Sequence, residues 1–121
     1  MENLRKKGGD YEARAAKYLS AQGYQIIERN FHCKMGEIDL IARDAEYLVF
    51  VEVKYRTTAA KGMPAEAVGF AKQRKICSAA SYYLMKHGYL ENVSVRFDVI
   101  AILGEDITLY RNAFPYIGYG R

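Results

Sequence analysis

Apolar residues recur with two different periods along the chain, and the period predicts each element. From Gly9 to Gln22 they return every three or four positions, which predicts a helix that ends before Gly23. The same spacing follows Pro64 and continues to Gly88. It predicts a second, longer helix with the proline in its first turn.

Five other segments are rich in β-branched and aromatic residues and alternate with a period of two, which is typical of β-strands. They are Tyr24–Cys33, Gly36–Arg43, Tyr47–Arg56, Val93–Leu103 and Asp106–Arg111. The polar residues 44–46 predict a hairpin between the second and third strands, so the first three strands are expected to form a meander. The resulting order, αβββαββ, predicts a single α/β domain over residues 1–121.

Charged residues interrupt the second and third strands, although their neighbours are apolar enough to be buried. Because strand residues two apart share a face, Glu52 and Lys54 are expected on one face with Phe50, and the three valines of Tyr47–Arg56 on the other. On the second strand the same rule groups Asp39 with Glu37 and Ile41. It assigns Ile38 and Leu40 together to the opposite face.

The predicted hairpin brings Asp39 close to Glu52, where two like charges are costly without a counter-ion. A hard divalent cation such as Mg²⁺ or Mn²⁺ would relieve that cost, because it prefers oxygen ligands. Lys54 would complete the site by neutralising a phosphate oxygen or by helping to orient and deprotonate a water. This set of residues indicates metal-assisted hydrolysis of a phosphodiester. Alternatively, Glu-x-Lys is common on solvated strands, and the charges would then only set the strand register.

Composition narrows the class of protein. Half of the 121 residues are hydrophobic, and no low-complexity stretch is present, so an ordered domain is expected. No apolar run is long enough for a signal peptide or a membrane span, so we expect a cytoplasmic protein without membrane contact. The net charge of +4 is compatible with nucleic acid as partner.

Several motifs together resemble the YraN family of small bacterial proteins, described as candidate endonucleases with a restriction-endonuclease-like fold. They are YEARAAKYL, RNFHCKMGEIDL, GEIDLIARD, LVFVEVKYR and RFDVIAI, and they span nearly the whole chain. The wider PD-(D/E)xK nuclease superfamily, which includes archaeal Holliday-junction resolvases, implies a mixed central sheet flanked by helices. It also implies a catalytic pocket at the strands.

The resemblance implies roles for individual residues. Asp39 matches the motif aspartate, Glu52 the second carboxylate and Lys54 the lysine, while the carbonyl of Val53 matches a frequent extra metal ligand. Glu12 aligns with the glutamate of the first helix that reaches towards the metal in the resolvase branch. Two positions depart from the pattern: isoleucine precedes Asp39 where the superfamily name has proline, and tyrosine precedes Glu12 where glycine is usual.

The second helix supplies the candidate nucleic-acid contacts. Gln73 is a candidate hydrogen-bond partner for substrate or water, and an exposed glutamine is the alternative. Lys72, Arg74 and Lys75 form a basic cluster around it that could follow a phosphate backbone, although a solvated helix face is the commoner outcome.

Two further features carry expectations. Asp98 is expected to pair with Arg96 or to cap a buried network. The aromatic C-terminal segment 113–121 is expected to pack on the domain or on a symmetry partner, which leaves a homodimer open, whereas stacking on bases is the alternative.

Three functions remain open from the sequence. The first is a metal-dependent endonuclease acting on DNA, including branched or structured DNA. The second is a nucleic-acid-binding module of the same fold with little or no cleavage. The third is a scaffold whose carboxylates only stabilise a hairpin.

Overall fold

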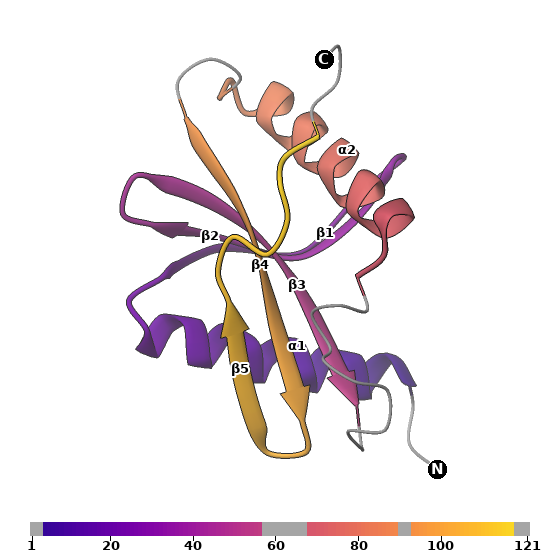
Figure 1. Cartoon of the computed structure of the whole chain (residues 1–121), viewed down its shortest axis with the longest axis vertical. Coiled ribbons are helices and arrows are strands. Elements are labelled where there is room, and N and C mark those ends of the chain that lie inside the picture. The colour runs from indigo at the N-terminus through magenta and orange to yellow at the C-terminus, as the bar shows by residue number, and fades with distance from the viewer. Residues whose placement is uncertain (1–3, 57–67, 90–92, 118–121) are drawn as a thin grey trace.

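The computed structural model describes residues 4–56, 68–89 and 93–117, and the side chains from residue 10 onward within them (Figure 1). Two helices and five strands follow one another in the predicted order αβββαββ. They are α1 (Leu4–Ala21), β1 (Gln25–Cys33), β2 (Gly36–Asp44), β3 (Tyr47–Arg56), α2 (Phe70–Lys86), β4 (Ser94–Leu103) and β5 (Asp106–Tyr110).

The strands form one mixed sheet in the order β1-β2-β3-β4-β5. The first three strands are the expected antiparallel meander, and β4 and β5 are also antiparallel. Among the described strands, only the central pair β3 and β4 runs parallel, from Tyr47↔Ser94 to Arg56↔Leu103. A parallel pair needs a crossover connection, and α2 lies within it. The α/β class and the mixed sheet expected from the sequence are thus confirmed.

Two apolar clusters hold the helices to the sheet, one on each face. Ala15 and Leu19 of α1 are fully buried against one face, with Leu40, Ala42, Val49, Val51, Val53, Ile100 and Ile102. Buried residues of α2 cover the other face, with Phe31, Ile38, Ile41, Leu48, Phe50, Phe97 and Val99. Within the described parts of the chain, neither helix is long and apolar enough to cross a membrane.

Both helices begin at residues other than those predicted. The first starts at Leu4, five residues before Gly9, so that Gly8 and Gly9 lie inside it. Extending an existing helix by a few residues costs little free energy. The two glycines therefore lower the stability of the helix without ending it. The second starts at Phe70, because Gly69 is extended, with φ −69° and ψ 168°. Pro64, its predicted first turn, lies outside the described residues.

The prediction that Ile38 and Leu40 share a face of β2 is wrong. This residue lies in the α2-side cluster with Ile41, whereas Leu40 lies in the α1-side cluster. The pairing of β1 with β2 passes from Arg29↔Leu40 to Phe31↔Ile38 and skips the two residues between, Asn30 and Asp39. Asn30 has a positive φ of 58°, a conformation that breaks the regular pleat. Strict alternation therefore fails at Asp39.

Residues 113–117 of the C-terminal segment pack on the domain, as one of the expectations held, and residues 118–121 lie outside the described residues. Phe114 is buried and stacks on Phe97, with ring centroids 5.1 Å apart. Tyr116 hydrogen-bonds Ser81 of α2, and the segment runs beside that helix in Figure 1.

Candidate active site

β3 carries three of the candidate residues, Glu52, Val53 and Lys54, and its faces are as predicted. Phe50 lies in the α2-side cluster, while the three valines of the strand lie in the α1-side cluster. Glu52 contacts Lys72 of α2, which puts its carboxylate on the same side as Phe50. The side chain of Glu52 is only 6% exposed, so this charge is buried in the wall of the sheet.

Asp39 lies where β2 separates from β3. The pairing of these strands ends at Leu40↔Val51, just beside Asp39. One carboxylate oxygen of Asp39 accepts a hydrogen bond of 2.7 Å from the backbone N–H of Val53. The side chain thus satisfies a donor that the β2–β3 ladder leaves unpaired at this point. This bond fixes Asp39 beside the residue that follows Glu52.

The two carboxyl groups affect each other in opposite directions: the charge and hydrogen bonding of Asp39 raise the pKa of Glu52, whereas hydrogen bonding with Glu52 lowers the pKa of Asp39. Burial is the main cause that raises the pKa of Glu52 to about 7, and the negative charge of Asp39 is the next. Burial also raises the pKa of Asp39, although the N–H of Val53 opposes this rise. Two buried acids that resist ionising together are a common feature of functional sites.

Two lysines offset this negative charge. The Nζ of Lys54 lies 3.9 Å from Oε2 of Glu52, and the Nζ of Lys72 lies 3.7 Å from the same oxygen. Both ammonium groups remain partly exposed, at 31% and 38% of their side-chain areas. Each can therefore reach a ligand from solvent while it neutralises Glu52. The contact of Lys72 with Glu52 was not predicted, because it depends on how α2 lies across β3.

Glu12 approaches the site from α1. It lines a cavity of about 200 Å³ together with Tyr11, Asp39, Val53 and Tyr55. Partial burial raises the pKa of Glu12, and the charge of Asp39 raises it further. The structure therefore brings Glu12 next to Asp39. The two tyrosines in this cavity were not predicted as site residues, although their positions beside Glu12 and Lys54 in the sequence offered a signal.

The chemistry of the donor set suits a hard divalent cation. Asp39 and Glu52 are oxygen donors whose mutual repulsion a cation would relieve, and Glu12 adds a third carboxyl at the adjoining cavity. In the described residues, no three His, Cys, Asp or Glu side chains are gathered tightly enough to hold a metal by themselves. Mg²⁺ usually uses only one or two carboxylates and completes its shell with waters and phosphate, so this donor set fits it.

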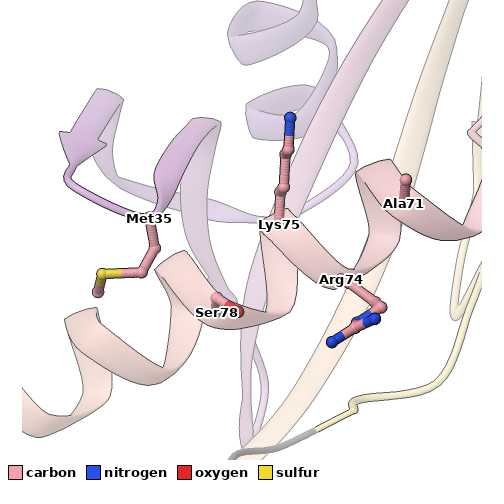
Figure 2. A pocket seen from close by; sticks show the side chains of 5 residues that line it. All are labelled: Met35, Ala71, Arg74, Lys75 and Ser78. Atoms are coloured by element: carbon pink, nitrogen blue, oxygen red, sulfur yellow. The ribbon is translucent and has the colours of Figure 1, made fainter.

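The other candidates on α2 lie apart from the carboxylates. The Nε2 of Gln73 donates a 2.8 Å hydrogen bond to the carbonyl of Val68, just before the helix. Arg74 and Lys75 line a second cavity of about 310 Å³ with Met35, Ala71 and Ser78. Figure 2 shows the two basic side chains leaving α2 in different directions. Gly36 lets the β1–β2 turn approach this helix, since a Cβ there would lie 3.4 Å from the carbonyl oxygen of Lys75.

Comparison with known proteins assigns the family. The model of a family described as "Uncharacterised protein family UPF0102" matches residues 11–102, which include Glu12, Asp39, Glu52 and Lys54. The chain belongs to the UPF0102 family. This is the YraN family that the sequence motifs resemble.

Relatives match the UPF0102 chain over almost its whole length. The UPF0102 protein of Lachnoclostridium phytofermentans is 51% identical over 116 residues, which cover 96% of this chain and 98% of the relative. That of Desulforapulum autotrophicum is 47% identical over 119 residues, covering 94% and 98%. That of Aliivibrio salmonicida is 48% identical over 114 residues, covering 92% and 93%.

Proposed function

We propose that this protein is a metal-dependent endonuclease that hydrolyses phosphodiester bonds in DNA, with branched or structured DNA among its substrates. The observation that carries the proposal is the buried pair Asp39–Glu52 with Lys54 beside it. Charges that only set the strand register can remain exposed to solvent. Glu52 is buried instead, and burial is the main cause of its raised pKa. The likeness of these motifs to the PD-(D/E)xK nucleases supports the same reading.

Each residue has a distinct part in this reaction. Asp39 and Glu52, with the carbonyl of Val53, would hold Mg²⁺ or Mn²⁺, and such an ion would supply charge neutralisation and a more acidic water. Hydrolysis joins a water oxygen to phosphorus and releases one ester oxygen, so negative charge builds up on the phosphate. The ammonium of Lys54 is near enough to Glu52 to stabilise that charge. Glu12 accepts a hydrogen bond from the attacking water.

Lys72, Gln73, Arg74 and Lys75 form the proposed nucleic-acid contact on α2. Lys72 links this surface to the carboxylates, because its ammonium already lies 3.7 Å from Glu52. A phosphate that binds beside Glu52 would meet both Lys54 and Lys72. Arg74 and Lys75 extend the positive charge along the helix toward the β1–β2 turn.

Cleavage of labelled linear, nicked, flapped and four-way DNA with Mg²⁺ or Mn²⁺ tests the proposal. The variants Asp39→Ala and Glu52→Ala should lose cleavage and bind metal more weakly. Lys54→Ala should still bind metal, yet it should cleave roughly 10²-fold more slowly, because it lacks a charge used in the transition state. Glu46→Ala, at the exposed hairpin turn, is the matched control and should cleave normally.

Two outcomes would contradict the nuclease. If the wild-type protein binds DNA and metal but cuts none of these substrates, the binding-module function replaces it. If Lys54→Ala cleaves as fast as wild type, the Glu-x-Lys pattern is a surface charge pair. Melting curves of all variants separate loss of chemistry from loss of folding.

A further inference from the structure

Two stacked tyrosines form one wall of the cavity that Glu12 and Asp39 also line. Tyr11 comes from α1 and Tyr55 from the end of β3. Their ring centroids are 4.0 Å apart, and the ring planes are 12° from parallel. The guanidinium carbon of Arg14 lies 5.7 Å from the centroid of the Tyr11 ring, which adds a positive charge next to the pair.

Tyr55 is not needed to hold α1 to the sheet. The fully buried residues Ala15 and Leu19 already hold that helix to the sheet. Tyr55, by contrast, is 39% exposed and is one of the few large apolar side chains of the described residues that face solvent to this extent. An exposed aromatic ring next to charged residues is a typical surface for stacking with a ligand.

The cavity beside the rings has the size and chemistry for a single flat ring system. Its volume of about 200 Å³ is below the roughly 300–1,000 Å³ of pockets that enclose drug-sized ligands. The aromatic wall offers a stacking surface. Glu12 and Asp39, which the proposed reaction uses, line the same cavity, so a base stacked on this wall would lie beside the phosphate.

We propose that Tyr55, supported by Tyr11, is a stacking site for one unpaired nucleobase adjacent to the phosphate that is cut. This inference rests on the proposed function and narrows its substrate to nucleic acid with an unpaired nucleotide at the site. A base inside a duplex has both faces covered by its neighbours and cannot stack on a protein ring, whereas a base in a single strand, flap or junction can. The guanidinium of Arg14 holds the ring of Tyr11 and adds charge for the backbone.

Binding without metal tests this site separately from cleavage. A single-stranded oligonucleotide that contains 2-aminopurine should bind the wild-type protein with quenched fluorescence, as stacking requires. Tyr55→Ala should weaken this binding roughly tenfold or more and remove the quenching, since each stacked base contributes strongly to single-strand affinity. Tyr55→Phe should keep both, because it keeps the ring. Binding of a blunt duplex of the same sequence should be nearly unchanged by Tyr55→Ala.

Two further variants make the test specific. Tyr55→Leu keeps the apolar bulk of the side chain but has no ring, so it should weaken single-strand binding and remove the quenching as Tyr55→Ala does. It replaces Tyr55→Ala in the test if the alanine variant folds poorly. Tyr116→Ala is the matched control, because Tyr116 is 38% exposed and contacts α2 and Phe97 on the other face of the sheet. It should bind as wild type does. The same strand made of RNA shows whether the site also accepts ribose.

The failures of the two proposals are distinguishable. If Tyr55→Leu binds and quenches as wild type does, or if wild type does not bind the single strand, the stacking site is overturned even when DNA is cleaved. An equal loss in Tyr116→Ala would overturn it as well. If stacking depends on Tyr55 but no substrate is cut with either metal, the nuclease proposal fails while the stacking site stands.

Discussion

At the scale of single residues, the buried carboxyl of Glu52 is strongly affected by its surroundings. Burial, followed by the charge of Asp39, raises its pKa from 4.5 to about 7. Between these values the folded state binds a proton that the unfolded state has released. Its contribution to stability is therefore complete below about pH 4.5 and is lost as the pH rises through about 7.

We expect the metal-free protein to become less stable between pH 5 and pH 8, and Glu52→Gln to reduce that change. The contribution of Glu52 is on the order of 3 kcal/mol, from the linkage between pKa and stability. Urea unfolding in EDTA at several pH values measures it, and the difference between the two proteins removes the effect of groups they share. Glu46→Gln, an exposed acid in the hairpin turn, is the control. Parallel profiles for wild type and Glu52→Gln would contradict the raised pKa.

At the scale of elements, Asp98 on β4 ties three segments together, as expected from its position. It is fully buried and accepts two hydrogen bonds of 2.9 Å from the guanidinium of Arg96. It also accepts bonds from the hydroxyl of Tyr24, before β1, and from the backbone N–H of Asn112, after β5. Arg96 in turn contacts Asp44 at the end of β2, 2.8 Å away. The expected pairing of Asp98 with Arg96 is confirmed, and the network is structural.

Asp98→Asn should therefore destabilise the fold strongly without touching the candidate site. Removing one partner of a buried ion pair leaves the other incompletely compensated, which costs about 3–5 kcal/mol. Thermal and urea unfolding measure the loss, and Asp106→Asn, on the exposed start of β5, should change little. Metal binding by the fraction that remains folded should match wild type. A variant with normal stability and weakened metal binding would show instead that Asp98 serves the site.

At the scale of the whole molecule, we expect the net charge of +4 to affect DNA binding through the positions of particular lysines. Lys72 lies at the carboxylates and Lys75 lines the cavity between α2 and the β1–β2 turn. We expect Lys72→Ala with Lys75→Ala to weaken DNA binding and to lower the slope of log affinity against log salt by about two, because each lost phosphate contact removes about 0.9 for duplex DNA.

Fluorescence anisotropy over a salt series measures that slope. Lys17→Ala with Lys86→Ala is the matched control, since it removes the same charge from exposed positions elsewhere. If both double variants change the slope equally, net charge and not this surface governs binding. If neither changes it, the proposed contact surface on α2 is wrong.

The sequence by itself determined the features that depend on local periodicity. The order of elements and the faces of β3 follow from spacings of two to four residues, so Glu52 and Lys54 could be assigned to one side of that strand. Asp98 could be paired with Arg96 for the same reason, since the two are two positions apart on β4. The nearness of Asp39 to Glu52 required only a hairpin whose turn residues were visible.

Only the tertiary structure decided what depends on how the elements meet. Ile38 lies on the other face than predicted at the point where the β1–β2 pairing skips Asn30 and Asp39 and where Asn30 has a positive φ. Lys72 reaches Glu52 because α2 lies across β3, and Tyr11 meets Tyr55 because α1 lies across the other face. These contacts join residues 20 to 44 positions apart. Repeating patterns describe one helix or strand at a time, whereas such contacts are set by the packing of the two buried clusters against the sheet.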